Sequence, residues 1–122
     1  MVDRDRKATG YFGEDVARRI LESRGYRLVE KNYTTRRGEI DLIMRKNNEI
    51  IFVEVKTRKN QAYGSALESI TPQKKDRIIR AAKVFLCSCR DVDPDVRFFA
   101  VEVLLDETGR HGKVRIYEDI FI

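Results

Sequence analysis

The chain has 122 residues, of which 42% are hydrophobic and 37% charged, a balance that favours one globular domain over residues 1–122 with a core of its own. No apolar run approaches the roughly 20 residues of a membrane-spanning helix, and the first ten residues hold no apolar stretch like that of a signal peptide. We therefore expect a cytoplasmic protein that makes no use of a membrane.

The net charge of +5 is unevenly distributed along the chain. Residues 1–83 hold 20 Lys and Arg against 12 Asp and Glu, whereas residues 84–122 hold 5 against 8. A local excess of positive charge is typical of proteins that bind a polyanion such as nucleic acid. The alternative is that this charge only keeps the protein in solution, and composition does not distinguish the two.

The first half of the chain predicts one helix and three strands. Apolar residues recur at helical spacing over 11–24, and a strand at 26–33 follows. A basic loop then leads into a hairpin, whose strands at 39–45 and 50–57 flank a turn at 46–48.

The second half begins with a loop at 60–69 and a helix that Thr71 caps and Pro72 opens. Its expected apolar face consists of Ile78, Ala82, Phe85 and Cys89, flanked by Ile79 and Leu86. Strands at 97–105 and 113–122 complete the chain. The order α-β-β-β-α-β-β predicts an α/β fold, a mixed sheet of about five strands with two main helices packed on it. Because a helix connects strands 50–57 and 97–105, we expect these two to be parallel neighbours.

Three charged residues, Asp41, Glu54 and Lys56, lie inside the hairpin strands. If the turn has an even number of residues, Asp41 lies opposite Glu54 and Glu39 lies opposite Lys56. Like charges across a sheet repel each other, so the pair requires a cation. Mg²⁺ suits such a site, since it binds one or two carboxylates together with waters and phosphate oxygens. The alternative is a solvated sheet face on which Asp41 pairs with Lys56.

Further features favour the first interpretation. Glu14 lies at the edge of the apolar arc of the first helix, and Lys74 and Lys75 extend the apolar stripe of the second helix to its N-terminus, where phosphate groups bind well. Tyr33 and Tyr63 offer stacking surfaces. The strands are also surrounded by basic residues, namely Arg36, Arg37, Arg45, Arg58 and Lys59.

Glu14, Asp41 and the tripeptide Glu54-Val55-Lys56 resemble the site of the PD-(D/E)XK nuclease superfamily, in a layout similar to that of archaeal Holliday junction resolvases. The segments GEDVARRILESRGYRLVEKNYTTRRGEIDLI, FVEVKTR, YGSALESITPQKKDRIIRAA and RFFAVEV resemble the YraN-like family of uncharacterised bacterial proteins. This resemblance covers roughly residues 10–104 and implies the restriction-endonuclease-like fold. The proline of the superfamily's name is absent, because Ile40 precedes Asp41.

The resemblance also implies roles for individual residues. Asp41 and Glu54, with the backbone carbonyl of Val55, would hold Mg²⁺ or Mn²⁺. Lys56 would position the attacking water, and Glu14 would support that water or a second metal. Lys74 matches the basic residue of the second helix that faces the site, whereas helical geometry turns Gln73 away from it. The residues expected to bind nucleic acid are Arg36, Arg37, Arg58, Lys59, Tyr63, Lys74 and Lys75.

The function we expect is a metal-dependent nuclease that hydrolyses phosphodiester bonds in DNA, including structured or branched DNA. One alternative is a nucleic-acid-binding module on a nuclease fold that does not cleave. The other is a protein-interaction scaffold in which the charged cluster is only structural. Because resolvase-like relatives act as symmetric dimers on two-fold substrates, we also expect a homodimer.

Overall fold

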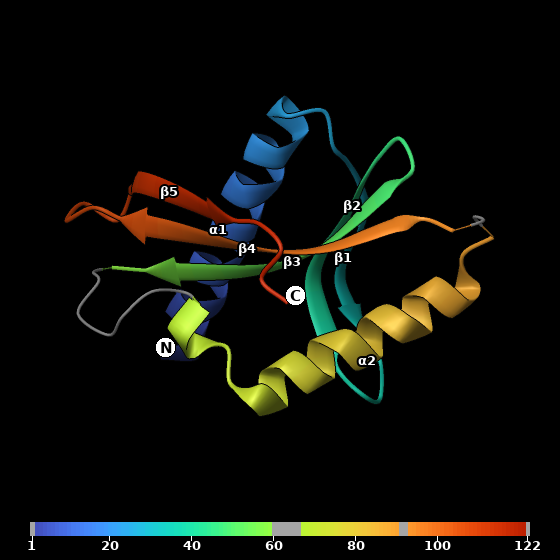
Figure 1. The fold of residues 1–122 in the computed structure, drawn as a ribbon. Coiled ribbons are helices and arrows are strands. Elements are labelled where there is room, and N and C mark those ends of the chain that lie inside the picture. Colours follow the sequence, from blue (N-terminus) through green and yellow to red (C-terminus); the bar gives the residue numbers. More distant parts are fainter. Residues whose placement is uncertain (1, 60–66, 91–92, 122) are drawn as a thin grey trace.

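The computed structural model describes residues 2–59, 67–90 and 93–121 and shows a mixed sheet between two helices (Figure 1). The elements are α1 (Val2–Ser23), β1 (Arg27–Thr34), β2 (Glu39–Lys46), β3 (Glu49–Arg58), the 3-10 turn η1 (Leu67–Ser69), α2 (Pro72–Ser88), β4 (Asp95–Leu105) and β5 (His111–Tyr117). This confirms the predicted α/β class and the predicted order of elements. Within the described ranges, no helix combines the length and the apolar character needed to cross a membrane.

The five strands lie in the order β1-β2-β3-β4-β5. Three of the four neighbouring pairs are antiparallel, and β3 and β4 are parallel from Glu49↔Asp95 to Arg58↔Leu104. The predicted parallel pair is therefore confirmed. Because α2 connects these two strands, it packs back onto the sheet beside them.

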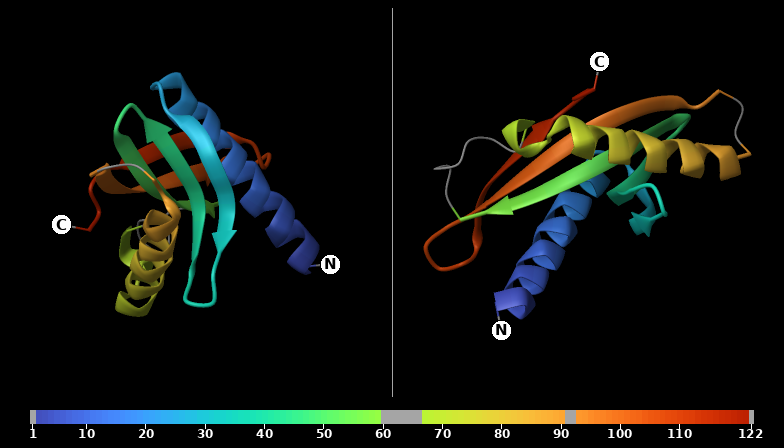
Figure 2. Two further views of the ribbon diagram at one scale, coloured as in Figure 1. Left: turned by 90° about the vertical axis from the view of Figure 1, so that its right-hand side faces the viewer. Right: turned by 90° about the horizontal axis from the view of Figure 1, so that it is seen from below.

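Each face of the sheet is covered by one helix, and the two helices lie on opposite sides (Figure 2). The core under α1 contains Val16, Ala17 and Leu21 of the helix and buried residues of β2, β3 and β4, and partly buried residues of β1 and β5 pack against it. The core under α2 contains Ile78, Ala81 and Ala82, with Phe85, Leu86 and Cys89 packed at its border. Ala81 thus takes the flanking position that the sequence pattern assigns to Ile79.

The observed boundaries differ from the predicted ones where apolar periodicity gives no signal. Helix α1 begins at Val2 rather than at residue 11, because the charged and small residues of its first turns carry no apolar rhythm. Strand β5 begins at His111, which the sequence pattern places in a turn. The hairpin turn consists of Asn47 and Asn48, since Lys46 still pairs with Glu49.

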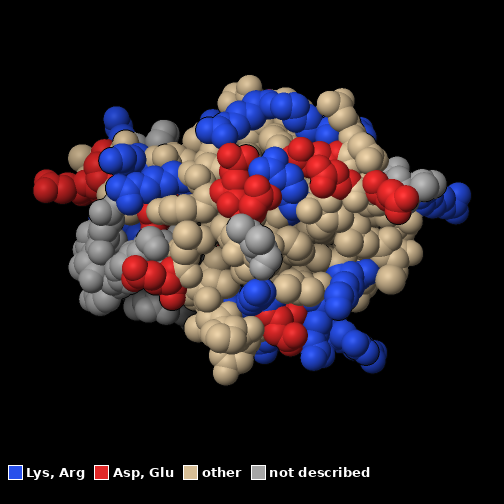
Figure 3. Space-filling view, in the orientation of Figure 1, with Lys and Arg blue, Asp and Glu red and all other residues tan. Residues whose placement is uncertain are grey.

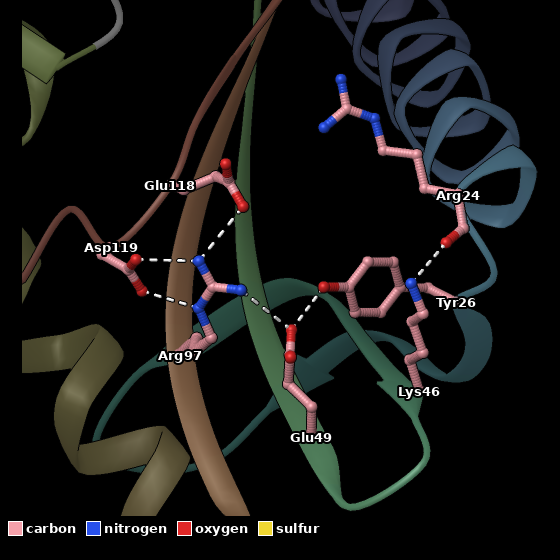
Figure 4. A network of polar contacts seen from close by, with 7 residues as sticks. All are labelled: Arg24, Tyr26, Lys46, Glu49, Arg97, Glu118 and Asp119. Carbon is pink, nitrogen blue, oxygen red and sulfur yellow. Dashed lines mark hydrogen bonds and ion pairs between the residues drawn. The ribbon is translucent and has the colours of Figure 1, made fainter.

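A network of charged side chains ties the segment after β5 to the sheet (Figure 4). The guanidinium of Arg97 makes ion pairs with Asp119 at 2.8 Å, Glu118 at 3.1 Å and Glu49 at 3.3 Å. The Tyr26 hydroxyl donates a hydrogen bond to the same carboxylate oxygen of Glu49. Burial and this bond to the Glu49 carboxylate raise the pKa of Tyr26 to about 12. The starts of β1, β3 and β4 and the C-terminal segment are therefore held together at one end of the sheet.

The loop between β1 and β2 lies directly on the backbone of α2. A Cβ atom at Gly38 would lie 2.1 Å from the carbonyl oxygen of Arg77, so only glycine allows this approach. The loop is a compact turn, because the Thr35 hydroxyl accepts hydrogen bonds from the N–H groups of Arg37 and Gly38, each at 3.1 Å. These contacts fix the distance between the loop and α2.

Substituting Gly38→Ala should lower the free energy of unfolding by about 1–3 kcal/mol, because the added methyl group forces the loop away from α2. Gly112→Ala is the matched control, since the nearest atom to its new Cβ is Asp106 Cβ at an ordinary 3.6 Å. We expect this control to change stability by less than about 0.5 kcal/mol. Urea unfolding of both variants measures the difference, and equal losses would contradict the close contact.

Candidate active site

A cleft of about 870 Å³ opens between the β1–β2 loop, the C-terminal half of β3 and the first turns of α2. Asp41, Glu54, Val55 and Lys56 lie in its wall, together with Lys74 from α2. Two neighbouring strands and a helix thus bring together the predicted catalytic and metal-binding residues other than Glu14. The cleft lies at the opposite end of β3 from the Arg97 network.

The predicted hairpin register holds over most of the hairpin but not at the site. The β2–β3 pairs run from Lys46↔Glu49 to Leu42↔Val53, as expected for an even turn. The regular ladder ends there, one pair before the expected partners Asp41 and Glu54. Instead, the Asp41 carboxylate turns toward β3 and accepts a hydrogen bond of 2.7 Å from the Val55 N–H. A side chain to backbone bond therefore places Asp41 beside Glu54, Val55 and Lys56.

The surroundings of Asp41 disfavour its charged form. Burial and then the negative charge of Glu54 raise the pKa of Asp41 to about 7, and the charge of Glu14 adds to this. The hydrogen bond from Val55 and the charge of Lys74 act in the opposite direction. At neutral pH the carboxyl group is thus divided between its two protonation states. A cation next to Asp41 would favour the carboxylate.

Glu54 is paired with Lys74. The distance from Glu54 Oε1 to Lys74 Nζ is 2.8 Å, and the exposed fractions of the two side chains are 12% and 36%. Lys74 reaches this position because Thr71 caps α2, with its hydroxyl accepting a hydrogen bond from the Lys74 N–H at 3.2 Å. The predicted cap is confirmed, and it sets the ammonium at the mouth of the cleft.

Lys56 lies in an environment that favours the neutral amine. Burial, followed by the positive charges of Lys74 and Arg58, lowers its pKa. Among the residues that the structure describes, no ion pair joins Lys56 to Asp41, the contact that a solvated charge cluster would require. A lysine with a lowered pKa has a larger fraction of neutral amine, the form that can accept a proton.

Glu14 lies on α1 and lines a neighbouring cavity of about 470 Å³ together with Asn32 and Leu42. Burial raises the pKa of Glu14, and a hydrogen bond with the Asn32 side chain lowers it. The negative charge of Glu54 also raises it. The charge of Glu14 therefore interacts with the carboxylates of the cleft, although Glu14 lies on the α1 side of the sheet. Asn32 is not among the predicted site residues, because a single Asn inside a strand carries no motif that points to a site.

The basic residues predicted to bind nucleic acid fall into two groups. Arg36, Arg37 and Lys74 line the cleft. Lys75 does not, because its ammonium lies over the ring of Phe121, 5.2 Å from the centroid. Arg58 lies close enough to Lys56 to lower its pKa, and Lys59 follows it as an exposed residue at the end of β3.

The two tyrosines predicted as stacking surfaces have different outcomes. Tyr33 is partly buried and packs edge-on against Phe85 at the border of the core under α2, with ring centroids 5.5 Å apart, and its role as a stacking surface stays a prediction. Tyr63 lies outside the described residues.

Three polar residues of α2 line the cleft without having been predicted, namely Gln73, Asp76 and Arg77. Gln73 and Arg77 both face it, whereas the helical wheel turns Gln73 away. The wheel fails here because the β1–β2 loop packs against the backbone of α2 at Arg77, so a side of the helix that would meet solvent elsewhere faces the cleft. Basic side chains gather in this region, at the lower right of the face drawn in Figure 3, where Figure 1 shows α2 and the β1–β2 loop.

The donor atoms in the cleft suit a hard divalent cation. No group of three or more His, Cys, Asp or Glu side chains is placed to hold a metal within the described part of the chain. Mg²⁺ does not need one, because it binds through one or two carboxylates and keeps several waters. Asp41, Glu54 and the Val55 carbonyl supply oxygen ligands of this kind, so the residues fit Mg²⁺ or Mn²⁺.

Comparison with known proteins identifies the family. A family model described as "Uncharacterised protein family UPF0102" matches residues 13–103. The chain belongs to this family. It is 41% identical to a UPF0102 protein of Chloroherpeton thalassium over 93% of this chain and 88% of the relative. It is also 39% identical to one of Alkaliphilus metalliredigens, over 94% and 98% of the two chains. The resemblance to the YraN-like family is thereby confirmed, and the matched span contains Glu14, Asp41, Glu54 and Lys56.

Asp41→Asn should stabilise the protein in a pH-dependent manner. The pKa of Asp41 is raised to about 7 in the folded protein, whereas it is about 3.9 in an unfolded chain. The folded state thus binds more protons between about pH 4 and pH 7, and the wild type loses stability as pH rises through this window. Asn cannot ionise and still offers an acceptor to Val55. The stability advantage of the variant should therefore grow by about 2 kcal/mol between pH 5 and pH 8. Urea unfolding at both pH values measures it, and a constant difference would contradict the assignment.

Proposed function

We propose that this UPF0102 protein is a metal-dependent nuclease of the PD-(D/E)XK superfamily that hydrolyses phosphodiester bonds in DNA. The observation that carries the proposal is the hydrogen bond from Val55 to Asp41, which sets this carboxylate beside Glu54 and Lys56. Two carboxylates and a lysine with a lowered pKa then share one cleft. This combination suits the hydrolysis of a phosphate ester better than it suits a structural charge cluster.

Asp41, Glu54 and the Val55 carbonyl would hold the ion. Bound there, Mg²⁺ or Mn²⁺ would supply positive charge against both carboxylates and against the phosphate group. Removal of the proton from Asp41 would accompany binding, because a ligating carboxyl group must be ionised. Glu54 would exchange its contact with Lys74 for the metal.

Lys56 and Lys74 would then act on the substrate. Lys56 would hold the attacking water and accept its proton, for which its lowered pKa prepares it. Lys74, released from Glu54 at the N-terminus of α2, would contact a phosphate oxygen. The placement of Lys74 depends on the cap at Thr71, which fixes the first turn of α2.

The rim of the cleft favours a polyanionic substrate. Arg36, Arg37 and Arg77 surround one side of it, and exposed guanidinium groups bind phosphates well. We propose DNA as the substrate, structured or branched DNA included, on the basis of the likeness to resolvases. The proposal includes a cytoplasmic location and a homodimer that acts on two-fold substrates.

One observation favours a second candidate function. The ion pair between Lys74 and Glu54 already compensates one of the two carboxylates with a charge of the protein itself. A protein with this pair can bind nucleic acid on its basic rim without cleaving it. Such a module would bind DNA in the absence of divalent metal, and neither Asp41 nor Glu54 would be needed.

Calorimetric titration with Mg²⁺ and Mn²⁺ tests the proposed ligands. We expect the wild type to bind one or more ions, with an affinity that rises with pH as Asp41 loses its proton. Asp41→Asn and Glu54→Gln should weaken binding by at least about tenfold, whereas Glu68→Gln, an exposed carboxylate in η1, should not. Lys56→Met should retain metal binding but abolish the cleavage of supercoiled or branched DNA. If the wild type binds no metal, and cleaves neither supercoiled nor branched DNA when Mg²⁺ or Mn²⁺ is present, the nuclease proposal fails.

The salt dependence of DNA binding separates the second candidate from a protein scaffold. If several phosphates are contacted, the logarithm of affinity should fall steeply with the logarithm of salt concentration, by about 0.9 for each phosphate contact. Replacing Arg37 by Ala should reduce this slope by about one contact. Filter binding at about 50–200 mM salt measures it. Absence of binding, or a flat dependence on salt, would contradict both nucleic-acid functions and leave the scaffold.

A further inference from the structure

Asn32 has an unusual backbone conformation for a residue within a strand. Its φ angle is +51°, in the left-handed region that most side chains avoid and that Asn tolerates. It lies between the β1–β2 pairs Lys31↔Leu42 and Tyr33↔Ile40, as Asp41 does on the neighbouring strand. A backbone conformation of this kind costs free energy and persists where the surrounding structure requires it.

At Asn32 and Asp41, the side chains of β1 and β2 no longer alternate regularly between the two faces of the sheet. In a regular strand, residues two positions apart point to the same face. Leu42 belongs to the core under α1, whereas Ile40 belongs to the core under α2, and its partner Tyr33 packs there too. The alternation is therefore shifted by one residue between positions 42 and 40. The left-handed Asn32 is the local backbone feature that accompanies this shift.

This shift explains why Asp41 does not take the ladder position opposite Glu54. At the point of the shift, the regular β2–β3 ladder ends after Leu42↔Val53. The Asp41 side chain then lies within reach of the neighbouring backbone and accepts the bond from the Val55 N–H. The carboxylate is thus aimed at β3 by a change in the backbone of the opposite strand, β1.

The side chain of Asn32 reaches toward the other acidic residue. Asn32 and Glu14 line the same cavity, between α1 and the β1–β2 pair, and the Asn32 side chain is close enough to lower the pKa of Glu14. Asn32 therefore lies next to two of the acidic residues of the site. Its backbone is adjacent to Asp41 on β2, and its side chain lies beside Glu14 on α1.

We propose that Asn32 is a positioning residue for the candidate site, whose left-handed backbone aims Asp41 at Val55 and whose side chain orients Glu14. The consequence for metal affinity depends on the proposed nuclease function, whereas the placement of Asp41 and Glu14 does not. Gly would preserve the backbone and lose the amide. Ala would disfavour the backbone and also lose the amide.

Amide hydrogen exchange at Val55 tests the backbone half of the proposal without any metal. Asn32→Ala should speed exchange of the Val55 N–H at least about tenfold relative to Val101 in the core, because its acceptor moves away. Asn32→Gly should leave the Val55 rate near that of the wild type. The matched control is Asn47→Ala, because Asn47 has a φ angle of +54° but lies in the β2–β3 turn. If Val55 exchanges at the same relative rate in Asn32→Ala as in Asn47→Ala, the backbone role is overturned.

A double-mutant cycle tests the side-chain half. Asn32→Gly and Glu14→Gln should change the free energy of unfolding non-additively, since their side chains contact each other. Additive changes would overturn this half.

Mg²⁺ titration of Asn32→Gly should also show several-fold weaker binding than the wild type. Unchanged affinity would show that the Asn32 side chain has no influence on metal binding. If even the wild type binds no Mg²⁺, the nuclease proposal fails, while the exchange rates and the cycle still decide whether Asn32 places Asp41 and Glu14. If Asn32→Ala does not fold, rapid Val55 exchange in Asn32→Gly, which keeps the backbone, would overturn the assignment.

Discussion

Asp41 and Glu54 place two like charges side by side in a half-buried cleft, and most features of the site compensate for their repulsion. Burial and the charge of Glu54 both oppose ionisation of Asp41. The Val55 N–H and the Lys74 ammonium partly offset this through a hydrogen bond and an ion pair. Structural clusters rarely concentrate carboxylates in this manner unless a cation completes them. A divalent cation would satisfy both groups at once, which is the reason for proposing metal-dependent chemistry.

The elements that carry this cluster are each held in place by contacts outside the cluster itself. Strands β3 and β4 are packed against a helix on each face. The C-terminal end of β3, where Glu54 and Lys56 lie, therefore has a fixed position relative to the core. The Thr71 cap sets the first turn of α2, and the contact of Gly38 with Arg77 fixes the β1–β2 loop against that turn. At the far end of the sheet, Arg97 anchors the C-terminal segment through its ion pair with Asp119. The cluster is therefore preorganised by packing, as binding of a hard cation and a phosphate requires.

The sequence predicts the fold well because its signals are local and repeated. Helical spacing, the Thr71-Pro72 start and the alternation in β3 each identify an element, and the family resemblance agrees with all of them. The shift of alternation at Asn32 is not predictable in this manner, because nothing in the sequence distinguishes a left-handed Asn within a strand from an ordinary one. For the same reason the sequence does not show that the β2–β3 ladder ends before Asp41 and Glu54, although both residues do meet. Gln73 and Arg77 are missed because a helical wheel shows which side of α2 meets the core, not which side the β1–β2 loop approaches.

The chemistry of the cleft depends on whether Asp41 and Glu54 hold a divalent cation beside Val55. Paramagnetic broadening of amide resonances during titration with Mn²⁺ tests this most directly, because broadening falls off steeply with distance from the ion. We predict that the resonances of Asp41, Glu54 and Val55 broaden first, and that excess Mg²⁺ restores them. Broadening confined to the acidic C-terminal segment at Glu118 and Asp119, or none at all, would contradict metal binding by these two carboxylates.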